Sequence, residues 1–179
     1  MMTFKLIESN SNLSSLYDSM RKEPYFVFVM GATGAGKNFI VRRNFPGVPL
    51  VDIDKYMAEM ASKEPDKTER DFISKAVHKA NKELKKFFEK GKSVIQTGTG
   101  GNLKGLENKL KLAKSYGMKT ALILVDTDIK KAKERNLQRA ENGEQRLVPE
   151  WKIDVSYKKS AENYETLKNT VDFSSTIFN

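Results

Sequence analysis

One glycine-rich segment has the residue types and spacing of a phosphate-binding loop: Gly31, Ala32, Thr33, Gly34, Ala35, Gly36 and Lys37. It matches the pattern G-x-x-x-x-G-K, in which glycines let backbone N–H groups turn inward around a phosphate. The segment follows the most apolar run of the chain, residues 25–30, and precedes a predicted helix whose N-terminus attracts anions. We therefore expect these residues to bind the phosphates of ATP, with the lysine reaching the β- and γ-phosphates.

The next residue departs from the usual form of this pattern. Asn38 stands where Ser or Thr normally places a hydroxyl on magnesium. An amide oxygen is also a suitable ligand for a hard cation. Asn38 is therefore the candidate metal ligand, and ATP with Mg²⁺ is the expected cofactor pair.

Two carboxylates, Asp52 and Asp54, belong to the second predicted strand and its end, residues 50–54. Ligands of parallel α/β sheets bind at the carboxyl ends of strands, where a carboxylate can take the proton of an attacking hydroxyl. Asp54 is the predicted base, and Asp52 is the weaker candidate, which can instead serve the substrate side or hold magnesium through water. Alternatively, Asp54 caps a helix beginning at Lys55, and both roles can hold together.

A basic segment contains Arg135 and Arg139, which are spaced i, i+4 and share one helix face. Two guanidinium groups on one face repel each other unless an anion lies between them. A triphosphate undergoing transfer is such an anion, and cations stabilise its developing charge. The alternative is an ordinary solvated basic face.

A second glycine-rich loop, residues 97–102, follows the third predicted strand. Four residues in and after it are the expected acceptor-binding groups: Thr97, Thr99, Asn102 and Lys104. Three further lysines follow, with Glu107 as the one opposing charge: Lys109, Lys111 and Lys114. This region either holds an acceptor phosphate or nucleic-acid backbone, or is a flexible crossover followed by a solvated helix.

These segments are positioned by an alternation of short apolar runs and longer helical stretches. That alternation predicts βαβ units and a parallel sheet. Strands are expected over residues 25–30, 50–53, 93–96 and 120–125, with an edge strand over 171–178. Helices are expected over residues 36–44, from 55, over 66–90, 103–116 and 128–142, and from 149. The last helix carries a predicted apolar stripe: Ile153, Tyr157, Ala161, Tyr164 and Leu167. The predicted fold class is α/β, a three-layer sandwich with four to five parallel strands, in a single domain over residues 1–179.

Composition excludes several other classes of chemistry. The 179 residues contain no cysteine and one histidine, His78, which excludes disulfide scaffolds, thiolate metal sites and histidine-rich metal sites. No apolar run approaches the roughly 18 residues of a membrane span, and the N-terminus lacks a signal-peptide core. We therefore expect a cytoplasmic protein without a membrane partner. The formal net charge of +9 favours anionic partners.

Together these features resemble the P-loop kinase family that contains the polynucleotide 5′-hydroxyl kinases and the zeta-toxin kinases. The resemblance rests on residues 31–37, 54–56 and 94–99, and on Arg135-Asn136-x-x-Arg139 followed by residues 147–149. It implies a P-loop NTPase fold of the nucleoside-kinase type, Asp54 as general base, and Arg135 and Arg139 clamping ATP in a lid over about residues 135–149. The chain departs from the family at Asn38, at Met57, where an acceptor-binding arginine often stands, and in lacking a carboxylate over residues 96–102.

The expected function is an ATP- and Mg²⁺-dependent kinase that phosphorylates a hydroxyl on nucleic acid. The acceptor would be a 5′-hydroxyl end or the hydroxyl of a modified base such as hydroxymethyluracil in DNA. One alternative is a small acceptor, a nucleotide-sugar or a nucleoside. Another is a regulatory module that binds a nucleoside triphosphate without catalysis.

Overall fold

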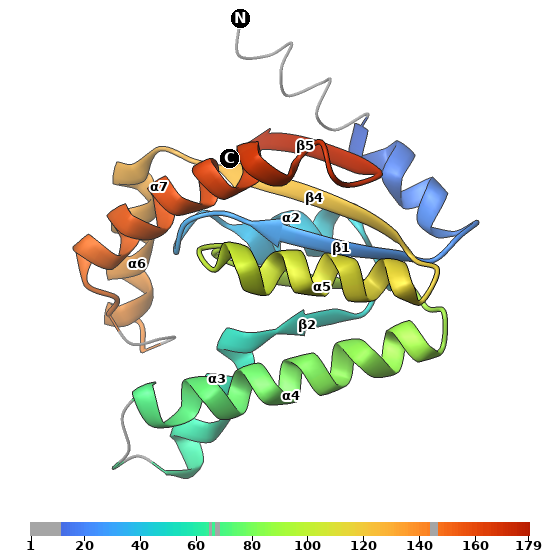
Figure 1. Cartoon of the computed structure of the whole chain (residues 1–179). Helices are drawn as coiled ribbons and strands as arrows, with labels where there is room; N and C mark the ends of the chain where they lie inside the picture. Colours follow the sequence, from blue (N-terminus) through green and yellow to red (C-terminus); the bar gives the residue numbers. More distant parts are fainter. Residues whose placement is uncertain (1–11, 65, 67–68, 144–146) are drawn as a thin grey trace, which may run out of the picture.

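The computed structural model describes residues 12–64, 66, 69–143 and 147–179. Five strands pair in parallel to form one sheet (Figure 1): β1 (Tyr25–Met30), β2 (Leu50–Asp52), β3 (Val94–Gly98), β4 (Lys119–Asp126) and β5 (Phe173–Phe178). Their order in the sheet is β2-β3-β1-β4-β5. All six residues of β1 are buried, as expected for the central strand of a sheet covered on both faces. The predicted α/β class is confirmed, and the C-terminal segment forms the predicted edge strand.

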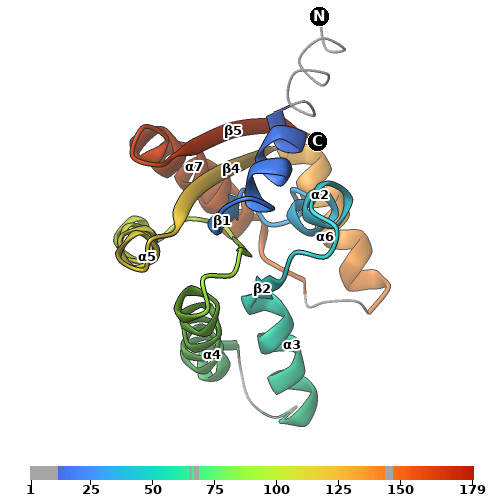
Figure 2. The same cartoon turned by 90° about the vertical axis from the view of Figure 1, so that its right-hand side faces the viewer.

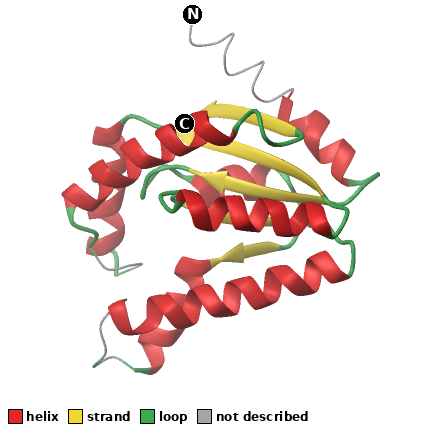
Figure 3. Ribbon diagram, viewed as in Figure 1, coloured by secondary structure: helices red, strands yellow, loops and turns green. Residues whose placement is uncertain are grey.

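Helices cover both faces of this sheet (Figure 3): α2 (Lys37–Asn44), α3 (Ile53–Lys63), α4 (Glu69–Glu89), α5 (Leu103–Ser115), α6 (Ile129–Glu141) and α7 (Glu150–Leu167). Residues 12–20 are also helical. One core packs buried side chains of α4, α5 and α7 against one face, and the other packs residues 12–20 and α2 against the opposite face. No helix in the described ranges has the length and apolar composition to cross a membrane.

The structure corrects two local predictions. Strand β2 ends at Asp52, because Ile53 already belongs to α3. The inner face of α7 is partly polar: its buried residues are Ile153, Ser156, Ser160, Tyr164 and Leu167. The expected stripe included Tyr157 and Ala161, which are only partly buried. The two serines satisfy their hydroxyls on backbone carbonyls of the same helix, so the burial of these groups costs little.

Helices α3 and α4 lie against each other beyond β2, at one edge of the sheet (Figure 2). The Tyr56 hydroxyl of α3 donates to the Glu83 carboxylate of α4. The Lys79 ammonium lies 4.2 Å from the centre of the Tyr56 ring and 3.1 Å from the Glu59 carboxylate. Burial and then the hydrogen bond to Glu83 raise the pKa of Tyr56, so the hydroxyl remains a donor at neutral pH. These contacts fix the position of α3, whose first turn carries Asp54.

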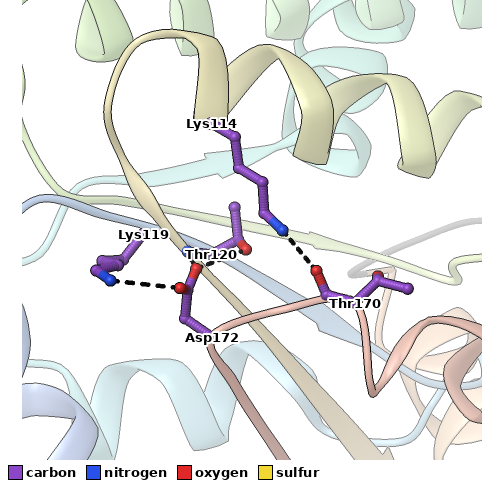
Figure 4. Close-up of polar contacts among 5 residues, drawn as sticks. All are labelled: Lys114, Lys119, Thr120, Thr170 and Asp172. Atoms are coloured by element: carbon purple, nitrogen blue, oxygen red, sulfur yellow. Dashed lines mark hydrogen bonds and ion pairs between the residues drawn. The ribbon is translucent and has the colours of Figure 1, made fainter.

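A polar cluster fastens the edge strand β5 at the end of the sheet where β4 and β5 begin (Figure 4). The Asp172 carboxylate accepts hydrogen bonds from the backbone N–H of Thr120 at 2.8 Å and from its hydroxyl at 3.1 Å. Lys119 lies 3.5 Å from the same carboxylate, and the Lys114 ammonium donates to the Thr170 carbonyl at 2.5 Å. Burial alone raises the pKa of Asp172, but the Thr120 hydrogen bonds and the Lys119 charge outweigh it and hold the pKa below its usual value.

We expect Asp172→Asn to lower the free energy of unfolding by about 2 kcal/mol at pH 7, because hydrogen bonds to a charged group are lost. The ionised carboxylate stabilises the fold above its unfolded pKa of about 3.9, and this contribution is lost as the pH falls through the lower folded pKa. The variant should therefore show a smaller loss of stability between neutral and acidic pH. Urea unfolding at several pH values measures both effects. Lys119→Met, which removes only the exposed partner of Asp172, should lower the free energy of unfolding by less than about 1 kcal/mol. An equal loss of stability in both variants contradicts this account.

Candidate functional site: a phosphate loop facing two carboxylates and two arginines

The phosphate-binding loop connects β1 to α2 in a conformation that requires glycine at critical positions. Gly34 and Gly36 have φ angles of 84° and 85°, in the left-handed region that residues with a Cβ rarely adopt. A Cβ on Gly34 would also overlap the backbone carbonyl of Ala132 in α6. The glycine spacing therefore serves both the turn itself and the close packing of the loop against α6.

Lys37, the first residue of α2, points its side chain back into the loop. Its ammonium donates to the carbonyl oxygens of Gly31 at 3.0 Å and Ala32 at 2.8 Å. Burial lowers the pKa of Lys37 to about 8, although the charges of Asp54 and Asp52 oppose this shift. The Lys37 ammonium is thus held at the loop, and its lowered pKa of about 8 lets it lose its proton just above physiological pH.

Two residues that the motif does not contain also hold the loop. Ser156 of α7 accepts a hydrogen bond from the Thr33 N–H at 3.3 Å, and the amide of Asn179 donates to the Ala35 carbonyl at 2.8 Å. Sequence reasoning missed both, because each lies more than 120 residues from its partner in the chain, at separations of 123 and 144 residues. Their effect is to tie the loop to the last helix and to the end of the edge strand.

Asn38 and Asp52 are in contact, and the local roles of the two carboxylates Asp52 and Asp54 differ from the expectation. The Asp52 side chain caps α3 by accepting from the Asp54 N–H at 3.0 Å, so Asp52 is the cap and the alternative that Asp54 caps this helix is wrong. The second Asp52 oxygen accepts from the Asn38 amide at 2.7 Å. Asp54 lies in the first turn of α3 with an exposed side chain. Both Asp52 oxygens are thus engaged in positioning, whereas Asp54 is presented at the surface of the site.

The donor set at Asn38 suits a magnesium ion bound together with nucleotide phosphates. Since a carboxylate only accepts hydrogen bonds, the Asn38 nitrogen faces Asp52, and the amide oxygen is the atom of Asn38 that could bind a metal. No cluster of three or more His, Cys, Asp or Glu residues suited to a metal exists in the described part of the chain. Magnesium does not require one, because it commonly takes one or two protein oxygens, phosphates and water.

Two arginines of α6 lie near the loop. Arg135 donates to the Gly34 carbonyl at 3.4 Å, and the charge of Arg139, one turn further on, contributes to lowering the pKa of Lys37. Between them, buried Asn136 donates to the Val148 carbonyl at 2.9 Å and accepts from its N–H at 3.2 Å. Asn136 thereby fixes the segment that leads into α7. Residues 144–146 of the predicted lid lie outside the described residues.

The predicted acceptor-binding residues divide into two groups. Thr97, Thr99 and Asn102 line a cavity of about 500 Å³ between α4, α5 and the end of β3, whereas Lys104 is exposed and does not line it. Asn102 also caps α5 by accepting from the Gly105 N–H at 2.9 Å.

The lysines of α5 do not form a single exposed strip. Lys109 turns inward and donates to the Gln96 side chain at 3.1 Å, and Lys114 donates to a backbone carbonyl. Lys104 and Lys111 remain exposed. Two of the four lysine ammonium groups of this helix, those of Lys109 and Lys114, are therefore hydrogen-bonded within the fold.

Several solved structures share this fold. A chain of the AvrRxo1-ORF1:-ORF2 complex with ATP has a TM-score of 0.68 and 17% identity, over 92% of this chain and 56% of that one. A chain from the PezAT toxin–antitoxin system of Streptococcus pneumoniae has a TM-score of 0.68 and 19% identity, over 93% and 76%. A chain of the Pnkp1/Rnl/Hen1 RNA repair complex has a TM-score of 0.67 and 16% identity, over 80% and 46%. The protein thus spans about half the length of the first and third of these chains, and at such identities the likeness concerns the fold.

The sequence itself has no match among curated proteins. It does match a family model described as an AAA domain, AAA_33, over residues 26–161, which is more than half of the chain. The match begins in β1 and ends within α7, so it includes the phosphate loop, both carboxylates and both arginines. The chain therefore belongs to the AAA_33 family of AAA domains.

Proposed function

We propose that this protein is an ATP-dependent phosphotransferase that passes the γ-phosphoryl group of ATP to a hydroxyl. The observation that carries the proposal is the hydrogen-bonded position of Lys37 inside the loop, where, besides burial, the charges of Asp54, Asp52 and Arg139 act on its pKa. Arg135 donates to a backbone carbonyl of the same loop. Cations at such a loop suit the charge of a triphosphate, and an exposed carboxylate near them suits an attacking hydroxyl.

In the proposed reaction, the acceptor oxygen attacks the γ-phosphorus and the bond to the β-phosphate oxygen breaks, leaving ADP. Asp54 takes the proton of the acceptor hydroxyl. Lys37, Arg135 and Arg139 stabilise the charge on the transferred group, and the N–H groups of the loop position the phosphates. We propose that a lid over about residues 135–149 brings both arginines onto ATP.

Asn38 would hold magnesium through its amide oxygen, with Asp52 acting on bound water. Magnesium held there would supply positive charge against the charge that develops on the phosphates during transfer. The hydrogen bond between Asn38 and Asp52 supports this assignment, since it fixes the orientation of the amide.

For the acceptor, we propose the hydroxyl of a nucleic acid, either a 5′ end or a modified base. The net charge of +9 and the exposed Lys104 at the start of α5 support this proposal. A small acceptor is the second candidate, and a specific observation favours it: the cavity beside the site has the size of a small-molecule pocket, within the usual range of about 300 to 1,000 Å³.

A labelled-ATP assay distinguishes these acceptors. Its panel contains 5′-hydroxyl oligonucleotides, DNA with hydroxymethylated bases, nucleosides and nucleotide-sugars. With a nucleic-acid acceptor, KM should rise about tenfold between about 50 and about 200 mM salt, because phosphate contacts release counterions. With a small acceptor, KM should change little. ATP binding without labelling of any acceptor would instead support a regulatory nucleotide-binding module and contradict the proposed activity.

A further inference from the structure

The cavity between α4 and α5 has predominantly apolar walls. Six of its lining side chains form a continuous hydrocarbon and aromatic surface from β1, α4 and α5: Phe28, Val77, Leu84, Phe88, Leu106 and Leu112. Ligand pockets commonly combine such walls with a few precisely placed polar groups. The walls suit a flat or apolar ring.

A charged side chain lines the same cavity. Lys109 of α5 is the one charged residue among the described residues that line the cavity. Its ammonium donates at 3.1 Å to a neutral acceptor, the Gln96 amide oxygen, and burial lowers its pKa. An ammonium carries three N–H donors, and Lys109 is partly buried with no carboxylate among the described residues that line the cavity, an arrangement that favours an anionic partner. An anionic group from a ligand would supply the missing counter-charge.

A second polar group, Gln96, lies beside Lys109 and holds its ammonium in place. The Gln96 side chain is completely buried, and its amide nitrogen has no hydrogen-bond partner within the described ranges. Gln96 lies on β3 directly beside Phe28 in the sheet register, and Phe28 lines the cavity. Gln96 itself does not line the cavity, so Lys109 is the charged donor that a ligand in the cavity can contact.

We propose that this cavity binds the acceptor substrate through an aromatic or apolar ring that carries an anionic oxygen, with that oxygen on Lys109. The inference rests on the proposed phosphotransferase function and specifies the small acceptor, the second candidate above, as the occupant of the same site. The position of the cavity supports it: Ile53, which lines the cavity, directly precedes Asp54, and Thr97, also lining it, pairs with Asp52 in the sheet. A ligand held there by its ring can extend a hydroxyl towards the carboxyl end of β2, where Asp54 follows.

Two fluorescent probes with the same ring system test the inference. One is 8-anilinonaphthalene-1-sulfonate, which carries an anionic group, and the other is N-phenyl-1-naphthylamine, which does not. Lys109→Met is expected to weaken binding of the sulfonate about tenfold while leaving the neutral probe within about twofold. Val77→Trp, which fills the rim of the cavity from α4, is expected to weaken both probes. Lys86→Met, at an exposed lysine of α4 that does not line the cavity, should change neither.

The inference is overturned if Lys109→Met leaves sulfonate binding unchanged, or if Val77→Trp leaves both probes unchanged. It is also overturned if the sulfonate displaces a fluorescent ATP analogue, because an acceptor must bind together with ATP. Urea unfolding of each variant confirms that it is folded. Binding of the ATP analogue separates the two proposals: its absence with normal probe binding contradicts the phosphotransferase, whereas its presence with unchanged sulfonate binding in Lys109→Met contradicts only the cavity assignment.

Discussion

Asp54→Asn is expected to lower kcat for phosphoryl transfer by about 100- to 10,000-fold, the range contributed by a general base. The amide has nearly the shape of the carboxylate but does not take the proton of an attacking hydroxyl. Asp54 is exposed in the first turn of α3, so the substitution should leave the protein folded. ATP affinity should change by less than about threefold, because the proposed nucleotide contacts come from the phosphate loop and from α6.

The matched control is Asp52→Asn, two residues earlier. The introduced asparagine keeps a side-chain oxygen that can cap α3, but its NH₂ group meets the Asn38 amide that now donates to Asp52. Asp52→Asn should therefore lower stability by about 1 kcal/mol and reduce transfer less than Asp54→Asn. Steady-state kinetics with the acceptor from the panel, together with urea unfolding, measure both effects. Undiminished turnover in Asp54→Asn, or a larger loss in Asp52→Asn, would show that the base has been assigned to the wrong residue.

Lys37→Met is expected to weaken ATP binding by about 100-fold at pH 7, because a charge-assisted contact to phosphate is lost. The same lysine should give the wild-type protein a distinctive pH profile. Burial holds the pKa of Lys37 near 8 in the protein without nucleotide, whereas a bound phosphate favours the charged form. Above pH 8 the lysine must take up a proton on binding, so ATP affinity should fall by up to about tenfold per pH unit. Below pH 8 this contribution to affinity is fully present.

Calorimetric titration of ATP between pH 6.5 and about pH 9.5 in buffers of different ionisation enthalpy measures both affinity and proton uptake. The control is Lys37→Arg, which keeps the charge at every pH and should flatten the profile even if its affinity is lower. A wild-type profile that stays flat above pH 8, or an identical fall in Lys37→Arg, contradicts the assignment of this titration to Lys37.

The parts of the site that lie close together in the chain could be predicted from the sequence. Gly31 to Lys37 form one local loop whose glycines, strand and helix agree with each other, and the structure places the loop as predicted. The sequence also predicts that Asp52 and Asp54 lie at the carboxyl end of the parallel strands, where ligands bind. The cap of α3 is Asp52 and not Asp54, because β2 ends one residue earlier than predicted and the helix begins at Ile53.

The parts formed by distant segments could not be predicted in this way. Ser156 and Asn179 hold the phosphate loop across more than 100 residues, with separations of 123 and 144. Helical spacing places Lys109 on α5, but it does not say that this lysine turns towards Gln96 rather than to solvent. A glutamine within an otherwise apolar strand was the one available signal, since a buried amide requires a polar neighbour.

The most direct test of the proposed phosphotransferase follows the γ-phosphate label of ATP in wild-type protein and in Asp54→Asn, with Mg²⁺ and the acceptor panel. We predict that wild-type protein moves the label onto the hydroxyl of one acceptor class, and that Asp54→Asn binds ATP with similar affinity but leaves the label on ATP. Label released only as free phosphate by wild-type protein, or transferred equally by both proteins, would contradict the central claim that Asp54 activates an acceptor hydroxyl for attack on ATP.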